Sequence, residues 1–162
     1  MARLRELMEA LRYRDVRTYV QSGNVVFSAP DTPPPDLEQQ LERAIAAEFG
    51  FDVSVVVRSR DELADVVALD PLGDIATDPA RYLVIFRAAP LDPERLAAID
   101  PAAFAPEAFH ARERELYVWA PEGMRDSALL KALSEQRLGG VATARNWRTV
   151  EKLLALADES EQ

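Results

Sequence analysis

The chain has 162 residues, of which 48% are apolar and 29% charged, and it contains no cysteine. This length suits one ordinary domain or two very small ones, and the composition is that of a soluble globular protein. The absence of cysteine excludes disulfides, thiolate metal ligands and cysteine nucleophiles. No apolar run approaches the roughly 20 residues that span a bilayer, and the first residues lack the apolar core of a signal peptide. We therefore expect a cytoplasmic protein without a membrane partner.

The formal net charge is −9 and the charge is unevenly distributed. An acidic protein repels phosphate at long range, which opposes non-specific binding to nucleic acid. Residues 1–28, however, carry five arginines against three acids, whereas residues 60–78 carry one arginine against six acids. The basic amino-terminal region could still receive an anion locally.

The first half of the chain reads as helix, hairpin, helix, strand and helix. Four apolar residues at helical spacing predict the first helix: Leu4, Leu7, Met8 and Leu11. Residues 16–27 alternate like a hairpin that turns at Ser22-Gly23. A helix from about Asp36 should end at Gly50, and the β-branched residues 53–57 predict a strand buried on both faces. Ser59 and Glu62 then form a capping box for a short helix.

The second half reads as strand, helix, hairpin, helix, strand and helix. A buried strand is expected at 82–86, and Asp92-Pro93 is typical of a helix start. Strands near Phe109 and at 115–119 should pair as a hairpin. A helix at about 126–138, a short strand at 141–145 and a last helix from Trp147 complete the order.

These orders predict an α+β fold made of two ferredoxin-like βαββαβ halves, each with an antiparallel sheet and helices on one face. The first half, 1–70, lacks the opening strand, and a linker at 71–80 leads to the second half at 81–157, followed by a frayed acidic tail at 158–162. Without its opening strand the first half would expose unpaired apolar strand edges. Another segment or another chain could fill the gap, but we expect that the natural start lies further upstream.

Two segments carry polar residues that strands do not need, residues 17–27 and 142–150. Residues 16–27, 49–53, 57–59 and 144–150 make the chain resemble the bacterial family called domain of unknown function 1697. The resemblance covers essentially the whole chain and implies the same two ferredoxin-like halves. Members of that family begin with a further strand, and they often have Ser-Lys-Leu where this chain has Ser127-Ala128-Leu129. The resemblance implies no activity.

The first candidate site is the turn formed by Gln21, Ser22, Gly23 and Asn24. Backbone N–H groups in such a turn could form an anion nest. Alternatively, the residues only make a hairpin turn, with glycine supplying a positive φ. Gln21 favours a function because a turn does not require it.

The second and preferred candidate site is formed by Arg145, Asn146 and Trp147, with Arg148 close by. The amino terminus of the last helix suits a phosphate or carboxylate, which the arginines could clamp. Trp147 could stack on a base or ring. In the alternative interpretation Asn146 is a helix cap, Trp147 is core and the arginines pair with surface acids.

Other side chains favour structural roles. His110, the only histidine, is expected on a hairpin surface, so neither a Ser-His-Asp hydrolase nor a transition-metal site is favoured. The acids of residues 61–74 suggest a solvated face rather than a magnesium site. Tyr19, Tyr117 and Trp119 could stack RNA bases on the sheet, but they are flanked by Val and Leu, which favours burial.

Three functions follow, in order of preference. The first is a non-catalytic module that holds a small anionic or nucleotide-like ligand in a cleft between the halves, using both candidate sites and no cofactor or metal. The second is a nucleic-acid-associated protein, which added salt would release. The third is an enzyme acting on a phosphorylated or carboxylated metabolite, although no catalytic set of residues is recognisable. The sequence does not determine the oligomeric state.

Overall fold

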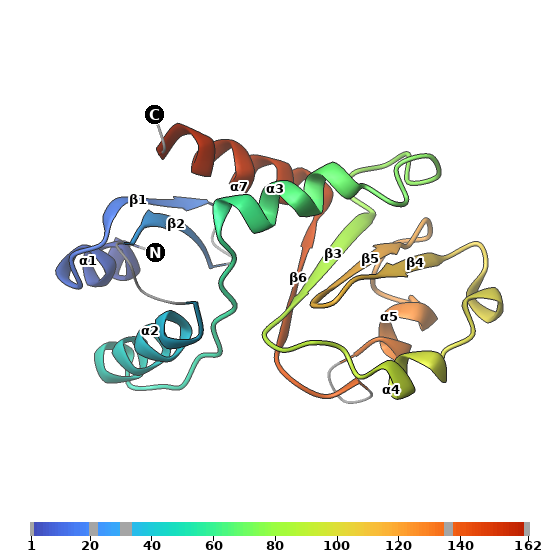
Figure 1. Cartoon of the computed structure of the whole chain (residues 1–162), viewed down its shortest axis with the longest axis horizontal. Coiled ribbons are helices and arrows are strands. Elements are labelled where there is room, and N and C mark those ends of the chain that lie inside the picture. Colours follow the sequence, from blue (N-terminus) through green and yellow to red (C-terminus); the bar gives the residue numbers. More distant parts are fainter. Residues whose placement is uncertain (1, 20–22, 30–33, 135–137, 161–162) are drawn as a thin grey trace. The chain divides into compact units, whose positions relative to one another are not determined.

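The computed structural model describes residues 2–19, 23–29, 34–134 and 138–160 (Figure 1). The chain folds as two compact units, Met1–Asp65 together with Glu151–Gln162, and Val66–Val150. The predicted linker at 71–80 thus lies within the second unit. The carboxy-terminal helix continues to Ser160, so residues 158–160, predicted as part of a frayed tail, are helical.

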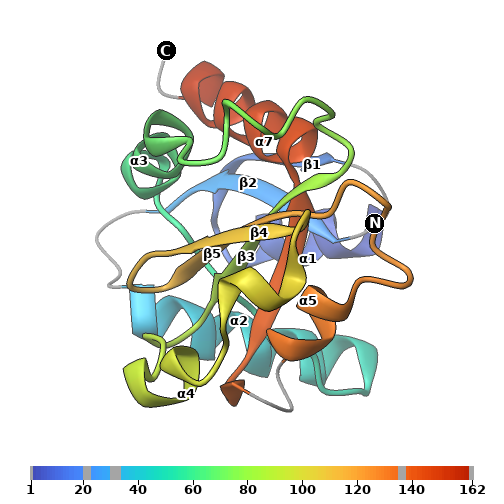
Figure 2. The ribbon, with the colours of Figure 1, turned by 90° about the vertical axis from the view of Figure 1, so that its right-hand side faces the viewer.

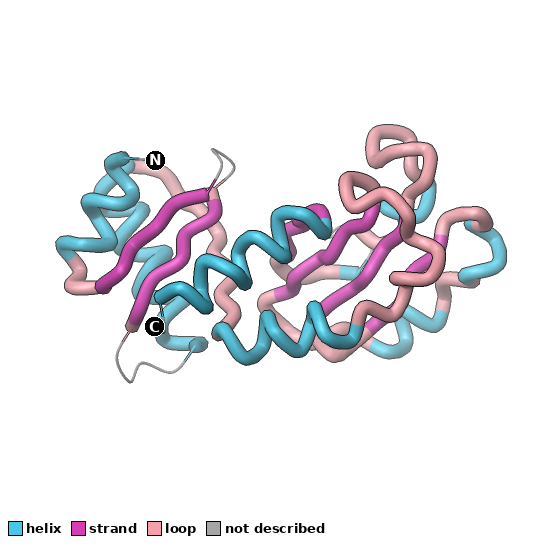
Figure 3. Tube along the Cα trace, turned by 90° about the horizontal axis from the view of Figure 1, so that it is seen from above, coloured by secondary structure: helices cyan, strands magenta, loops and turns pink. Residues whose placement is uncertain are grey.

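The first unit contains a two-stranded antiparallel sheet and the helices around it (Figure 3). Its elements are α1 (Ala2–Ala10), β1 (Arg14–Tyr19), β2 (Asn24–Ser28), α2 (Pro34–Phe49), the first residues of α3 (Arg60–Leu69) and most of α7 (Trp147–Ser160). The expected hairpin is present, with Tyr19 opposite Asn24 and Thr18 opposite Val25. The capping box at α3 is also confirmed, because Ser59 and Glu62 exchange side-chain to backbone bonds of 2.8 and 3.1 Å.

One apolar cluster forms the core of the first unit. Its buried members come from α1, β1 and α2: Met8, Val16, Leu37 and Leu41. Partly buried residues pack against them, among them Tyr13 and Phe27, whose ring centroids lie 4.9 Å apart. Of the apolar stripe predicted for the first helix, α1 buries Met8, whereas Leu11 follows the end of the helix and is 40% exposed.

The strand expected at residues 53–57 is absent, which corrects the prediction. The segment runs from α2 to α3 without regular secondary structure (Figure 1). It is also not buried on both faces, since Val53 is 39% exposed. The physical reason is that a β-branched run becomes a strand only when a neighbouring backbone pairs with it. Here the N–H groups of Val55 and Val57 instead donate to side-chain carboxylates of α2.

The second unit contains a four-stranded antiparallel sheet with strand order β4-β5-β3-β6. Its elements are β3 (Tyr82–Arg87), α4 (Pro93–Ala97), the 3-10 helix η1 (Pro101–Phe104), β4 (Ala108–Ala111), β5 (Glu115–Trp119), α5 (Ala128–Ala132), β6 (Ala142–Asn146) and the start of α7. All six residues of β3 are buried, as expected for a central strand. The α+β class, with helices packed on antiparallel sheets, is therefore confirmed.

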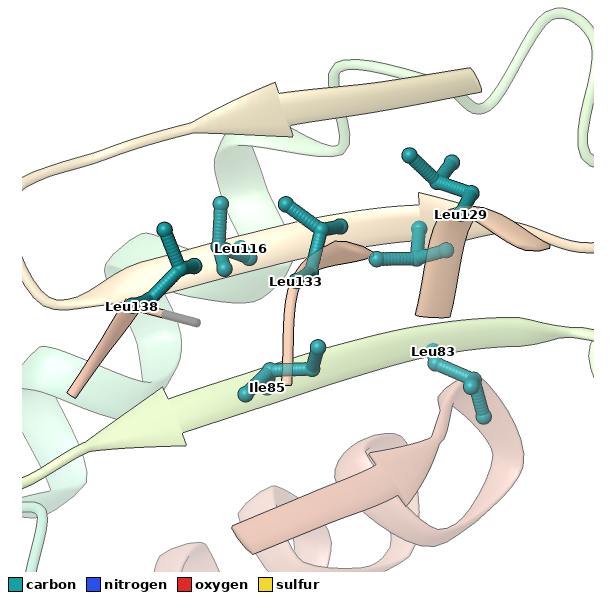
Figure 4. Packing of buried hydrophobic residues seen from close by; sticks show 7 residues of the cluster. Leu83, Ile85, Leu116, Leu129, Leu133 and Leu138 are labelled. Carbon is teal, nitrogen blue, oxygen red and sulfur yellow. The ribbon is translucent and has the colours of Figure 1, made fainter. Parts of the chain in front are cut away.

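Alternation along the strands separates the two faces of this sheet. Leu83 and Ile85 of β3 point to the face that α5 covers, together with Leu116 of β5 (Figure 4). Leu96 of α4 packs against the same cluster, and Figure 2 shows α4 and α5 together beside the sheet. Because side chains alternate between the two faces along a strand, the side chain of Tyr82, which precedes Leu83, lies on the opposite face of the sheet.

The helix predicted at about 126–138 is shorter in the described residues. It begins at Ala128, because Ser127 caps it, and its regular part ends at Ala132. Residues 135–137 of the predicted helix lie outside the described residues. The expected start of α4 is confirmed, with Asp92 accepting the backbone N–H of Glu94 and proline at the first helical position.

Candidate functional site

The preferred site lies where β6 ends and α7 begins. β6 pairs antiparallel with the central strand β3, which places Arg145 opposite Val84 and Asn146 opposite Leu83. Since Val84 and Leu83 are buried, the corner is fixed to the core of the second unit. The next residue, Trp147, is already helical.

Asn146 caps helix α7, as one of the two interpretations expected. Its Oδ1 accepts the backbone N–H of Thr149 at 2.9 Å. This bond satisfies one of the amide groups that the first turn of a helix leaves without an intrahelical acceptor. Asn146 therefore sets the position at which the strand becomes a helix.

Trp147 belongs to an aromatic cluster rather than to an open surface. Its side chain is 8% exposed. The indole stacks on Tyr82 with ring centroids 4.5 Å apart and planes 11° from parallel, and the Tyr117 ring lies 6.3 Å away. One face of the indole is thus occupied by Tyr82, which leaves little of Trp147 for stacking on a ligand.

The two tyrosine hydroxyls of this cluster bind the segment that includes the end of α3. Tyr82 donates to Asp70 Oδ1 at 3.0 Å and accepts the Leu72 N–H at 3.3 Å. Tyr117 donates to the Val66 carbonyl at 2.7 Å. Burial raises the pKa of both phenols, and for Tyr82 the neighbouring Asp70 carboxylate raises the pKa further.

Sequence reasoning missed this network. The acids around Asp70 indicate only a solvated face, and the residues around Tyr82 indicate only a buried strand. The only signal in the sequence is a tyrosine opening an otherwise aliphatic buried strand, because a buried phenol generally needs a hydrogen-bond partner. Nothing local to Tyr82 identifies Asp70 as that partner.

Arg145 is the charged group of the corner. Its side chain is half-buried, and Nη1 donates to Thr143 Oγ1 at 2.6 Å and to the Ala144 carbonyl at 2.8 Å. Burial lowers the pKa of the guanidinium. A partly desolvated guanidinium gains more from a nearby anion than one in water does, and its planar fork suits phosphate or carboxylate. Arg148, in contrast, is exposed.

The other predicted site, the turn at residues 21–24, belongs to the first unit and is considered by itself. Gln21 and Ser22 lie outside the described residues. Gly23 has a φ of 87°, which glycine adopts without strain. Asn24 is 6% exposed, and its Nδ2 donates to the Tyr19 carbonyl at 3.0 Å, across the hairpin. This contact is one that a simple turn uses.

The remaining candidates occupy structural positions. His110 is exposed on β4, with its ring 6.2 Å from that of Tyr117, in line with the hairpin surface expected for it. Tyr117 and Trp119 are buried, which agrees with the interpretation that favoured burial over RNA stacking. Across the part of the chain that the structure describes, no three His, Asp or Glu side chains are arranged to hold a metal ion. No helix within the described ranges is long and apolar enough to cross a membrane.

Comparison with known proteins finds a family and a solved structure to which the chain is similar. A solved structure of conserved bacterial protein SP0830 from Streptococcus pneumoniae is similar in fold, with a TM-score of 0.73 and 23% sequence identity. The similarity covers 98% of this chain and 88% of that one. A comparison with curated proteins gave no match. Residues 1–117 match the family described as "Protein of unknown function (DUF1697)", and the chain therefore belongs to this family.

Proposed function

We propose that the protein is a cytoplasmic, non-catalytic module that binds a small anion, a phosphate or carboxylate group, at Arg145 beside the first turn of α7. The observation that carries the proposal is the half-buried guanidinium of Arg145, held by Thr143 and partly desolvated. Keeping a charged group away from water is unfavourable unless polar or charged groups compensate. Beside the contacts that Arg145 already makes, an anion at this position would interact more strongly with the partly desolvated guanidinium than with one in water.

The surroundings of Arg145 favour a negative ligand. The amino terminus of α7 carries the positive end of the helix dipole and amide groups that point out of the first turn. Helix α7 is 14 residues long, so this effect is fully developed. Asn146 and Trp147 would not contact the ligand but would hold Arg145 in place. Asn146 does so by capping α7, and Trp147 does so by stacking on Tyr82. A nucleotide would then be held by its phosphate rather than by stacking on Trp147.

We also infer that the second unit is a ferredoxin-like domain. The support is its element order, βαββαβ, together with a strand order in which the first strand, β3, lies between the third and the fourth. Helices α4 and α5 pack on one face of this sheet. On this assignment the corner at Arg145 follows the fourth strand of the domain.

The turn at Gln21 to Asn24 stays in the proposal as an independent anion nest of the first unit, supported by the positive φ of Gly23. Nucleic-acid binding is a weaker alternative, because Tyr117 and Trp119 are buried and the net charge of −9 repels phosphate. Enzymatic activity is a weaker alternative still, because no catalytic set of acid, base and nucleophile is recognisable in the sequence.

The test is a thermal-shift screen of the whole chain with inorganic phosphate, acetate, adenosine monophosphate and a short single-stranded oligonucleotide, at low and high salt. A ligand that binds only the folded state raises the melting temperature by mass action. We expect phosphate and the nucleotide to raise it in the natural chain, with the effect lost in Arg145→Ala and partly kept in Arg145→Lys. Arg125→Ala removes an exposed arginine of the same unit and serves as the matched control.

Each result has a distinct meaning. A shift that Arg145→Ala leaves unchanged would reject this site. A shift produced only by the oligonucleotide, and abolished by salt, would favour the nucleic-acid alternative. Circular dichroism of each variant separates lost binding from lost folding.

A further inference from the structure

The last turn of α7 carries charges that oppose its own helix formation. Its acids are Asp158 and Glu159, and no basic residue lies in this turn. The carboxyl end of a helix is the negative end of its dipole, so carboxylates there are unfavourable. The sequence accordingly predicted a frayed tail at 158–162, whereas the helix continues to Ser160. Groups outside α7 must therefore offset the repulsion.

Two arginines of the first unit receive these carboxylates. Nε of Arg60 donates to Asp158 Oδ1 at 2.6 Å, and Arg17 of β1 donates to the Glu159 carboxylate. The side chains of the two arginines are 37% and 40% exposed, respectively. Partial burial strengthens an ion pair relative to one in water, because the effective dielectric constant is lower. The pairs join residues 98 and 142 positions apart, so they form only when the first unit is folded.

Arg60 also lies at the unfavourable end of its helix. It is the first residue of α3, where the helix dipole is positive and a cation is disfavoured. Asp61, which Arg60 also contacts, is 88% exposed and so compensates little. The bond from Arg60 to Asp158 thus joins two helix ends, each with a charge that its own dipole disfavours. Both charges become favourable only when the two ends are docked.

The order of the last turn therefore depends on a balance of small contributions. Half-exposed ion pairs and contacts between a charge and a helix dipole have similar, modest free energies. Loss of one pair is enough to shift such a balance toward the unwound state. The beginning of α7 differs, because burial of Trp147 and Val150 fixes it.

We propose that the last turn of α7 is an autoinhibitory latch, which covers a pair of arginines that bind carboxylates. The latch is closed and helical while Arg17 and Arg60 hold Glu159 and Asp158. It unwinds when an acidic peptide segment takes the same arginines, because the carboxylates of α7 are then left at the negative end of the helix. The partner is acidic because neighbouring carboxylates on a peptide are the groups that the two arginines hold in this structure. The latch does not depend on anion binding at Arg145.

Amide hydrogen exchange of the whole chain, followed by NMR, measures the opening of the latch. Arg17→Ala and Arg60→Ala should each speed the exchange of residues 156–159 by about two- to fivefold, since each removes one ion pair. The amide of Val150 monitors the rest of the fold, and its exchange rate should not change. Arg5→Ala breaks an exposed ion pair within α1 of the same unit. It is the matched control and should leave all these rates unchanged.

Neutralising the acids gives the decisive comparison. Asp158→Asn together with Glu159→Gln removes the ion pairs and the repulsion from the dipole at once, so the last turn should stay as ordered as in the natural chain. In this neutral background Arg17→Ala and Arg60→Ala should no longer change the exchange rates. Hexaglutamate peptide, added at constant ionic strength, should speed the exchange of residues 156–159 in the natural chain but not in the neutral variant.

Four results would overturn the proposal. Arginine variants that leave the exchange of residues 156–159 unchanged would show that the ion pairs do not hold the turn. Equal effects of the arginine variants in both backgrounds would show that the arginines act without the acids. A natural chain whose exchange does not respond to hexaglutamate would show that an acidic segment does not compete for the arginines. A matching rise in exchange at Val150 would mean a general loss of stability instead of a local opening.

Discussion

Glu38 of α2 accepts the backbone N–H of Val57, and one helical turn further on Glu42 accepts that of Val55. The two spacings match, because four residues of helix rise about 6.0 Å and two residues of an extended chain advance about 6.6 Å. A row of carboxylates on a helix thereby replaces the row of carbonyls that a neighbouring strand would offer. This arrangement orders residues 53–57 without placing them in a sheet.

We expect Glu38→Ala and Glu42→Ala each to lower the free energy of unfolding by about 1 kcal/mol, because each removes the acceptor of a backbone N–H. Both glutamates are only half-buried, so solvent compensates for part of the loss. Glu38→Gln keeps an acceptor oxygen and should lose less. Urea unfolding measures the change, and Gln40→Ala, an exposed position on the same helix, is the control. Equal losses in the alanine and glutamine variants would show that the carboxylate does not act as an acceptor.

Local patterns predicted the elements whose cause is local. The capping box at Ser59, the start of α4 at Asp92 and the hairpin between β1 and β2 depend on neighbours a few residues away, and all three are present. Residues 53–57 have the composition of a strand, but a strand also needs a partner backbone far away in the sequence. The prediction was wrong because the partner, not the composition, decides the outcome.

The candidate site divides in the same way. Asn146 was predictable as a helix cap, since a cap is set by the residues that follow it. The stack of Trp147 on Tyr82 joins residues 65 positions apart in the printed sequence, and the bond from Tyr82 to Asp70 crosses a loop. Sequence periodicity does not predict contacts between residues so far apart. From the sequence alone, Trp147 could therefore either stack on a ligand or be buried in the core. Burial distinguished the two interpretations.

Trp147→Ala should be among the most destabilising single changes in the second unit. Truncating a buried aromatic side chain typically lowers the free energy of unfolding by about 3–5 kcal/mol, and the stack on Tyr82 adds to that loss. Arg148→Ala, at the next position but exposed, should change it by no more than about 0.5 kcal/mol. Thermal and urea unfolding of both variants give the comparison. A mild effect of Trp147→Ala would mean that the indole is not part of the core in solution.

The buried phenols of Tyr82 and Tyr117 predict a loss of stability in alkali. Their pKa values are raised in the folded state, whereas an unfolded tyrosine titrates near pH 10. Above that pH the unfolded state has released protons that the folded state still holds. The free energy of unfolding therefore falls as the pH rises, by up to about 1.4 kcal/mol per pH unit for each group.

Tyr82→Phe tests this account. At pH 8 it should destabilise the protein by about 1 kcal/mol, because Asp70 and the Leu72 N–H lose their partner. Above pH 10 its stability should fall less steeply than that of the natural chain, since one titrating phenol is gone. Urea unfolding at pH 8, 10 and 11 measures both effects. Parallel pH profiles of the two proteins would contradict the assignment of the alkaline loss to Tyr82.

Two serine caps of different burial allow a paired prediction. Ser127 is 4% exposed, its Oγ accepts the Leu130 N–H at 3.0 Å, and its hydroxyl donates to the Glu107 carboxylate. Ser59 caps α3 in the same way, through the Glu62 N–H, but is exposed. Alanine at either position removes the cap.

Ser59→Ala should lower the free energy of unfolding by about 1 kcal/mol, since water can replace the hydroxyl and Glu62 still accepts the Ser59 N–H. Ser127→Ala should lower it by about 2–3 kcal/mol, because the Leu130 N–H and a Glu107 oxygen both lose a partner where water has little access. Urea unfolding of Ser59→Ala and Ser127→Ala provides the measurement. Glu107→Gln keeps the Ser127 cap and one acceptor oxygen, so it should lower the free energy of unfolding by less than Ser127→Ala does. If Ser127→Ala lowers the free energy of unfolding by no more than Ser59→Ala, the contact with Glu107 adds no stability to that of an ordinary cap. Burial of the cap would then not increase its contribution.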